Sequence, residues 1–310
     1  MKTNMKHQDP LKSRSRASLH RPLTETLHGI WVFARNRPLA AASLTALLSM
    51  VIVAILADVI ATHDPLVQDA TQRLRPPGLP HYFGTDGFGR DIFSRVAHGA
   101  RVSLFVGFVG VRSAALTGTC IGVSSAYWGG KLDLLVQSVV DVFLGFPFLV
   151  LALIMVVAMG PSSTSVAVAI ALALAPQIAR LSRASALSVK GETYVEAAAA
   201  IGASSYRVIW RHLLPNRFPP ILAQITGYFG VAVVAETTLS FLGLGVPPPF
   251  PSWGRMLEEG VRQYFEVAPW ATVFPGLALS LTVLSSALLG DAVRDLLDPR
   301  HASSERARLP

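Results

Sequence analysis

The sequence predicts an all-α membrane protein with six transmembrane helices and both termini in the cytoplasm. Hydrophobic residues make up 51% of the 310 residues and charged residues only 15%, and the mean hydropathy is +0.46. Soluble globular chains carry about 25% charged residues, so this deficit indicates a chain that lies largely in lipid. The apolar residues gather in six runs, each close to the roughly 20 residues that a helix needs to cross a bilayer. The basic residues gather between these runs.

The first apolar run, 38–61, follows a basic tail, 1–37. The run is longer than the core of a cleaved signal peptide, about 7–15 residues, and its leader is long, so we expect a permanent anchor. An external loop, 62–102, comes next. It is followed by a membrane core, 103–290, and a C-terminal tail, 291–310. The core contains five more predicted spans, at 103–128, 134–160, 161–179, 221–246 and 269–290.

The third and fourth spans almost touch in the sequence. This predicts a hairpin whose turn lies at Gly160, Pro161 and Ser162. The sixth span is separated from the fifth by a second external loop, 247–268. That loop begins with a proline-rich stretch, "GVPPPFPSWG", which favours an extended path.

The basic residues predict the orientation of the chain. Nineteen Lys and Arg residues lie in the two tails and in the segments near 131 and 180–217, against seven in the loops of the opposite side. Cytoplasmic loops carry the excess of Lys and Arg, so both tails should be cytoplasmic. The net charge of +8 does not indicate nucleic acid, because the basic residues form no single patch beside stacking aromatics. We therefore expect contact with membrane lipid and no nucleic-acid binding.

The external loop 62–102 contains "HYFGTDGFGRDIFSRV", residues 81–96. Gly84, Gly87 and Gly89 are typical of turns, and Asp91 is placed to cap a short helix. The aspartates do not follow the spacing of a calcium loop. The sequence therefore predicts a folded turn here and no metal site.

No pattern of catalytic residues appears in the chain. There is no G-x-x-x-x-G-K-[ST] phosphate loop, no zinc spacing among the eight histidines and no G-x-S-x-G elbow. The single cysteine, Cys120, lies inside an apolar run, where a small hydrophobic role is typical. We expect no enzymatic activity and no cofactor in this chain.

The segment 191–216, "GETYVEAAAAIGASSYRVIWRHLLPN", is too polar to span a membrane and too apolar for an ordinary loop. Thr193 and Glu196 have the spacing of a capping box, followed by four alanines and by Gly202, which suits a left-handed helix end. Ser204 can cap a second helix, which we expect to stop at Pro215. The pattern predicts two short helices joined at an angle.

The faces of the second short helix suggest how this segment is used. Val208, Ile209, His212 and Leu213 fall near one face, whereas Tyr206, Arg207 and Arg211 lie toward the others. A helix pair lying on lipid would need a continuous bulky apolar face. Because the first helix offers mainly alanine, docking into a groove of another protein is the better interpretation.

The same stretch resembles the cytoplasmic EAA loop in the membrane subunits of bacterial ATP-binding cassette importers. That pattern is Glu-Ala-Ala, three residues, Gly, nine residues, a bulky residue, any residue and Leu-Pro. His212 stands where Ile or Val is usual. The matching residues are Glu196, Ala197, Ala198, Gly202, His212, Leu214 and Pro215.

Four further stretches resemble one subfamily, the dipeptide, oligopeptide and nickel permeases. They are "FGTDGFGRDIFSRVAHGARVSL" (83–104), "VDVFLGFPFLVLAL" (140–153), "AETTLSFLGLGVPPPFPSWGRML" (235–257) and "LLGDAVRDLLDPR" (288–300). The external Gly-Thr-Asp loop is similar to that of the second, C-type permease of the two that such systems usually carry. Peptides, nickel, glutathione and some sugars or opines are carried by similar permeases, so the substrate stays open.

The resemblance implies a type I ABC importer transmembrane fold in the bacterial inner membrane. It also implies a non-identical second permease, two ATPase subunits that bind ATP and Mg²⁺, and an extracytoplasmic substrate-binding protein. In that family the EAA loop docks into a cleft of the ATPase subunit and passes its movement to the spans. The alternatives are a secondary transporter or channel working alone, an exporter and, last, a membrane-anchored enzyme.

Apart from Asp58 near the end of the first run, three charged residues fall inside predicted spans: Arg112, Asp141 and Glu236. Such residues cost about 2.5–3.5 kcal/mol on insertion scales and mark functional sites. At about 1.5 Å per residue, Arg112 and Asp141 differ by roughly 6 Å in depth, which a long arginine side chain can cover. We therefore expect an Arg112–Asp141 pair. The alternatives are Arg112 facing an aqueous pathway, pairing with Glu236, or pairing with a partner subunit.

Overall fold

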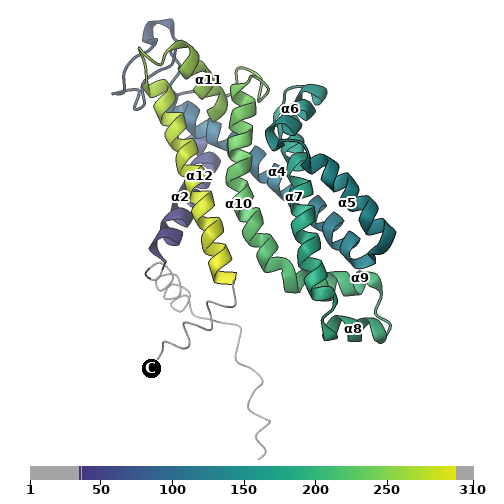
Figure 1. Ribbon diagram of the computed structural model, residues 1–310. Coiled ribbons are helices and arrows are strands. Elements are labelled where there is room, and N and C mark those ends of the chain that lie inside the picture. The colour runs from purple at the N-terminus through teal and green to yellow at the C-terminus, as the bar shows by residue number, and fades with distance from the viewer. Residues whose placement is uncertain (1–34, 36, 298–310) are drawn as a thin grey trace, which may run out of the picture. The chain divides into compact units, whose positions relative to one another are not determined.

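The computed structural model describes residue 35 and residues 37–297. The chain divides into two units at residue 42, and the described part of the first unit contains only the start of one helix. Within the described residues the regular structure is helical, apart from one isolated bridge between Thr85 and Asp91. The elements, shown in Figure 1, are α2 (Pro38–Ile55), α3 (Ala57–Ile60), η1 (Ala70–Gln72), α4 (Ile92–Trp128), α5 (Gly130–Leu144), α6 (Phe148–Met159), α7 (Ser163–Lys190), α8 (Thr193–Ala200), α9 (Ser205–Val208), the π-turn η2 (Ile209–Leu213), α10 (Leu214–Phe241), α11 (Trp253–Gln263) and α12 (Trp270–Leu297).

Five of the described helices, α2, α4, α7, α10 and α12, are long and apolar enough to cross a membrane. A sixth span exists if α5 and α6 are counted together. The all-α fold with up to six spans is thus confirmed. The predicted tails fall largely on residues 1–34, 36 and 298–310, which lie outside the described part of the chain.

The long helices extend beyond the apolar runs that predicted them. Helix α4 begins at Ile92 and not at 103, α7 continues to Lys190, and α12 continues to Leu297. Hydropathy marks only the part of a helix that suits hydrocarbon, whereas the helix itself continues to its cap. Asp91 does cap a helix, as predicted, because its carboxylate accepts a hydrogen bond from the Ser94 amide at 2.8 Å. That helix is the long α4 and not a short one.

The third predicted span, 134–160, was wrong as a single helix. It is divided into α5 and α6, which meet at an angle of 90°. Pro147 has no amide hydrogen, and its ring disfavours helical geometry at the preceding Phe146. The break therefore falls inside a stretch whose hydropathy is uninterrupted. The hairpin turn after it is confirmed, since Gly160 has φ +83° and Ser162 caps α7 through the Ser165 amide.

Helices α4 and α7 pack through small residues on α4. Gly110, Ala114, Gly118 and Gly122 recur every fourth residue and are all buried. A Cβ atom on Gly118 would lie 2.6 Å from the carbonyl oxygen of Ala175 on α7. Small residues allow the close approach of helices that drives packing in membranes, where burial from water contributes little.

Polar contacts fix the ends of this helix pair where α4 stops and α7 stops. Lys190 at the end of α7 donates to the carbonyl oxygens of Ala126 and Tyr127 at 3.0 and 2.7 Å, which caps the C-terminus of α4. Arg183 on α7 binds Asp133 on α5 with two hydrogen bonds of 2.7 and 2.5 Å. The last turns of α7 are thus held to the C-terminus of α4 and to the first turn of α5.

The segment 62–102, predicted to be an external loop, is folded and packs against α11. Gly84 and Gly89 have φ +76° and +75°, which confirms the predicted turns. Trp253 of α11 is fully buried and donates to the Val96 carbonyl oxygen at 3.0 Å. The guanidinium of Arg90 lies 2.6 Å from Asp86 and 2.7 Å from Glu259, so a buried ion network joins the loop to α11.

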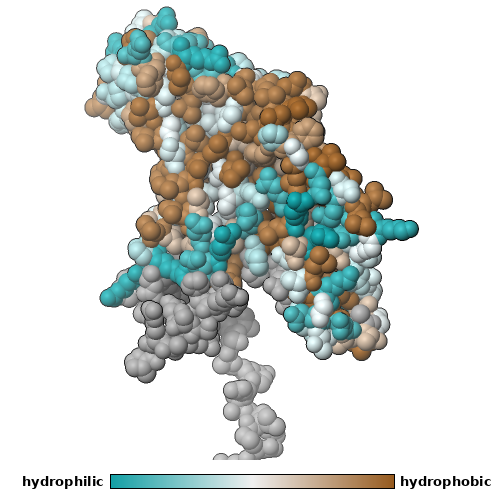
Figure 2. All heavy atoms as spheres, viewed as in Figure 1, coloured by the Kyte–Doolittle hydropathy of each residue, from teal (hydrophilic) through white to brown (hydrophobic). Residues whose placement is uncertain are grey.

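The surface agrees with a membrane location. Figure 2 shows hydrophobic residues over α6 and along the upper part of α12, with hydrophilic residues gathered around α11. Many large apolar side chains of the described helices are exposed, among them Leu135, Val142, Val157 and Leu277. An apolar surface of this extent suits lipid or partner helices.

Candidate coupling segment and membrane groove

The segment after α7 is bent at Gly202. This glycine has φ +82°, and the Ala203 amide donates to the Ala198 carbonyl oxygen at 3.1 Å, which is the long bond of a Schellman motif. The Ser204 side chain then accepts from the Arg207 amide at 3.4 Å and caps α9. The predicted pair of short helices joined at an angle is therefore present.

The capping box at the start of α8 is not formed. Thr193 is already helical, and the Glu196 amide donates to the Glu192 carbonyl oxygen at 3.2 Å rather than to the Thr193 hydroxyl. Helix α8 begins at Thr193, one residue earlier than the sequence predicted. The residue just before the helix is therefore Glu192, whose carbonyl oxygen accepts the first helical hydrogen bonds. Glu196 itself is exposed on α8.

Pro215 does not stop the second helix. Residues Ile209–Leu213 form a π-turn, and α10 continues from Leu214 with Pro215 in its first turn. The Leu214 amide donates to the Ile209 carbonyl oxygen, five residues back. A π-turn inserts an extra residue, so the helical path can continue although Pro215 lacks an amide hydrogen. The segment from 205 to 241 is consequently one helical path into the membrane.

An apolar cluster anchors this segment to the core. Val195 of α8, Val208 of α9 and Leu213 of the π-turn are buried with Val189 at the end of α7. Ile209 packs against Val123, Ala126 and Ala186 as well. The predicted inner face is confirmed for Val208, Ile209 and Leu213, whereas the side chain of His212 lies outside the described ones.

The opposite face of the segment is largely exposed. Tyr194 and Ile201 of α8 are 43% and 85% exposed, and Ala197 lies between them on the same face. Tyr206 is 72% exposed, and Arg207 and Arg211 are exposed, as predicted. Large apolar groups presented on a rigid, thin helix are suited to contact with another protein.

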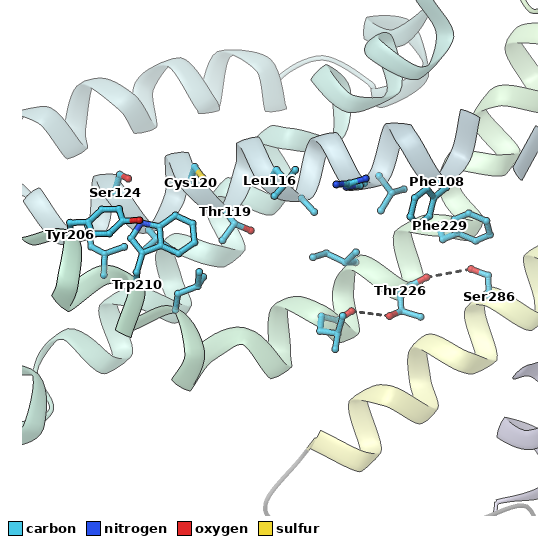
Figure 3. A pocket seen from close by; sticks show the side chains of 18 of the residues that line it. Phe108, Leu116, Thr119, Cys120, Ser124, Tyr206, Trp210, Thr226, Phe229 and Ser286 are labelled. Atoms are coloured by element: carbon cyan, nitrogen blue, oxygen red, sulfur yellow. Dashed lines mark hydrogen bonds between the residues drawn. The ribbon is translucent and has the colours of Figure 1, made fainter. Parts of the chain in front are cut away.

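A groove of about 810 Å³ runs from the middle of α4 to this segment. Figure 3 shows Phe108, Leu116, Thr119 and Cys120 along one side of it, with Tyr206 and Trp210 at its end. Phe229 and Thr226 of α10 face them, and the Thr226 carbonyl oxygen accepts from the Ser286 hydroxyl at 3.4 Å. Volumes of this size hold small-molecule ligands.

Arg112 is the one charged residue among the described residues that line the groove. It is exposed, and no ion pair or hydrogen bond joins it to another described side chain. Asp141 instead binds Arg180 on α7, and both side chains are more than half exposed. The expected Arg112–Asp141 pair is therefore wrong.

The depth argument failed because it ignored the direction in which each side chain points. The break at Pro147 leaves α5 packed beside α7, so Asp141 meets Arg180, whereas Arg112 faces the groove toward α10. Glu236 is not the partner of Arg112 either. It is 1% exposed, and its carboxylate accepts from the Ser240 hydroxyl at 2.7 Å.

Comparison with known proteins gives a consistent family assignment. Residues 118–303 match the model for the binding-protein-dependent transport system inner membrane component, and residues 27–77 match the N-terminal TM domain of oligopeptide transport permease C. A putative peptide transport system permease protein of Brucella suis biovar 1 (strain 1330) is 44% identical over 83% of this chain and 86% of its own. A probable D,D-dipeptide transport system permease protein of Escherichia coli (strain K12) is 40% identical over 87% of this chain and 90% of its own.

A solved structure shares the fold at low sequence identity. The structure titled as an inward-facing conformation of the MetNI methionine ABC transporter aligns with a TM-score of 0.56 and 19% identity. The alignment covers 67% of this chain and 98% of that one. It shows that the described helices follow an ABC importer membrane-domain fold.

Proposed function

Because the chain belongs to the family of binding-protein-dependent transport system inner membrane components, we propose that it is one of two permease subunits of an ATP-driven importer for peptides or a related small solute. The observation that carries the proposal is the bent segment α8–α9, which presents Glu196 and Ala197 outward and continues directly into α10, a helix that lines the groove. Relatives named as peptide, dipeptide and D,D-dipeptide permeases support the substrate class.

In this proposal the coupling residues divide into two groups. Ala198 and Leu214 are turned toward the anchoring clusters, and Gly202 sets the bend between α8 and α9. Glu196 and Ala197 are on the outer surface, and Pro215, also exposed, stands just after the π-turn. His212 belongs to this set because of its place in the EAA pattern of the sequence. A push on α8 would be passed through the rigid path 205–241 to the groove wall.

The ATPase partners would supply the chemistry that this chain lacks. No phosphate-loop pattern is present in the sequence, so ATP and Mg²⁺ belong to two partner ATPase subunits in this proposal. The second permease would close the groove, and a substrate-binding protein would deliver the solute at the face that carries α11. The membrane is the bacterial cytoplasmic membrane, with both termini inside according to the distribution of basic residues.

Reconstitution tests the proposal. The chain, its second permease, the ATPases and the binding protein are placed in proteoliposomes, and uptake of radiolabelled dialanine is measured with ATP, without ATP and with vanadate. We expect uptake only with ATP and all subunits, and ATPase activity stimulated by the binding protein. Uptake by the chain alone without ATP would overturn the proposal in favour of a stand-alone secondary transporter or channel.

Arg112→Leu is expected to lower dialanine uptake by about tenfold or more, whereas Arg112→Lys should keep most of it. A charged hydrogen bond to a substrate carboxylate is worth about 1.5–3 kcal/mol, and about 1.4 kcal/mol corresponds to a tenfold change. Assembly of the complex should not change, because Arg112 makes no ion pair or hydrogen bond with another described side chain. Wild-type uptake by Arg112→Leu would show that Arg112 does not bind the solute.

A further inference from the structure

Three side chains with metal-binding atoms meet on the external side, at the start of α4. They are His63, which follows α3, His81 in the external loop, and Asp91, the N-cap of α4. One ligand atom from each lies within 4.8 Å of the other two. We propose that His63, His81 and Asp91 form a binding site for a divalent transition-metal ion of the zinc class.

The distances suit a tetrahedral ion. The Nδ1 atoms of His81 and His63 lie 2.9 and 3.8 Å from Oδ1 of Asp91. Zinc bonds to nitrogen and oxygen of about 2.0–2.2 Å place neighbouring ligands of a tetrahedron roughly 3.3 Å apart. Both distances to Asp91 are within about 0.5 Å of this value, and the ligand atoms of the two histidines lie within 4.8 Å of each other. Small side-chain rotations are therefore sufficient to complete the coordination.

The carboxylate of Asp91 is already oriented for this role. Its Oδ2 atom accepts from the amide and the hydroxyl of Ser94 at 2.8 and 2.7 Å, which turns Oδ1 toward the two histidines. Thr62 also lies within 3.4 Å of Oδ2 through its hydroxyl. Outer hydrogen bonds of this kind fix the ligands of metal sites and contribute strongly to affinity.

A purely structural role accounts for only part of this cluster. The hydrogen bond between His81 and Asp91 supports the N-cap of α4 without any ion. It does not account for His63, whose ring lies 4.5 Å from that of His81 between centroids and whose Nδ1 atom contacts the Thr62 hydroxyl at 3.0 Å. His63 is held there through its backbone, because its amide donates to the Ser94 hydroxyl at 3.1 Å.

The site is accessible and suited to soft or borderline metals. The side chain of His63 is 38% exposed and lines a pocket of about 660 Å³ that also contains Asp58 and Asp64. Arg101 of the same pocket binds Asp58 at 3.0 Å, so the attraction for a cation comes from Asp64 and from Asp91 itself. Two imidazoles and one carboxylate favour zinc, cobalt or nickel over magnesium or calcium, and three protein ligands leave one position for water. A bound ion would tie the end of α3 and the external loop to the first turn of α4.

Cobalt titration tests the site without any transport assay. The full complex, purified without a polyhistidine tag and treated with EDTA, is titrated with Co²⁺, and the visible absorption of tetrahedral cobalt is followed. We expect one equivalent per copy of this chain, displaced by Zn²⁺. His63→Gln should weaken Co²⁺ binding more than about 100-fold, since outer-shell partners alone are worth about 10–100-fold.

A neighbouring histidine provides the matched control. His98 lies in the same pocket but binds Asp58 at 3.1 Å and the Ser94 carbonyl oxygen at 2.9 Å, and His98→Gln should leave cobalt binding unchanged. His63→Gln should keep the thermal stability of the metal-free complex, because its side chain is partly exposed. Absence of tetrahedral cobalt in the wild type, or equal binding by wild type and His63→Gln, would overturn the proposal.

Discussion

Gly202→Val is expected to abolish ATP-driven uptake while the membrane helices stay folded. Gly202 has φ +82°, a conformation in which a β-branched residue is a genuine outlier. No atom lies within 4 Å of the position that its Cβ would take, so the effect is one of backbone conformation and not of collision. A valine would straighten or displace the junction of α8 and α9, and α8 would no longer meet the ATPase at the required angle. Dialanine uptake and stimulation of ATPase activity by the binding protein measure the loss.

Gly202→Asn is the matched control for this prediction. Asparagine is the residue that most often replaces glycine at a left-handed helix end, so this variant should retain most of the uptake. Glu196→Lys tests the contact itself, because Glu196 is exposed and its replacement changes charge without disturbing the core. Equal uptake by wild type, Gly202→Val and Glu196→Lys would refute the proposed coupling role of the segment.

The elements that the sequence predicted well are those encoded locally. The composition and the six apolar runs are sufficient for the fold class, and Asp91 and Ser204 each cap the helix that follows them, as predicted. The left-handed conformation of Gly202 was also predictable, because a glycine that follows an alanine-rich helix commonly ends that helix. Such signals depend on a residue and its immediate neighbours, which the sequence contains in full.

The two prolines were misinterpreted in opposite ways. Pro147 breaks a span by 90° although its apolar run is continuous, and the signal was the Phe146–Pro147 pair inside that run. Pro215 was expected to end a helix, yet the π-turn before it lets the helical path continue. Whether a proline bends, breaks or is accommodated depends on the packing of its neighbours, which sequence alone does not contain.

Residues that meet across the fold were the hardest to predict. The Arg112–Asp141 hypothesis rested on depth in the membrane, but pairing also requires that two side chains point toward each other. Asp141 lies against α7 and finds Arg180 there. The cluster of His63, His81 and Asp91 was missed for the same reason. These residues belong to no spacing motif, and only the path of the external loop brings them together.

Gly122→Ala is expected to prevent correct folding of the chain, although it adds a single methyl group. A Cβ atom on Gly122 would overlap the carbonyl oxygen of Ala179 and would lie 2.9 Å from the backbone nitrogen of Arg183. Both are backbone atoms of α7, so no side chain can rotate away. Relief requires α7 to move along its length, together with the Arg183–Asp133 contact and the anchor of the coupling segment. Overpacking of this kind destabilises proteins by about 1–3 kcal/mol and sometimes more.

Gly227→Ala on α10 separates this effect from helix propensity. No atom lies within 4 Å of the Cβ position of Gly227, and alanine is favoured over glycine inside a helix by about 1 kcal/mol. Gly227→Ala should therefore leave the melting temperature of the detergent-solubilised complex unchanged or raise it, whereas Gly122→Ala should aggregate or melt well below the wild type. Size-exclusion profiles and thermal-shift curves of both variants make the comparison. Since propensity favours alanine at both positions, a loss at Gly122 alone would isolate the close approach of α4 and α7 as the cause. Equal stability of the two variants would mean that α7 can shift without cost in stability. The small residues of α4 that face α7 would then not hold the coupling segment in place.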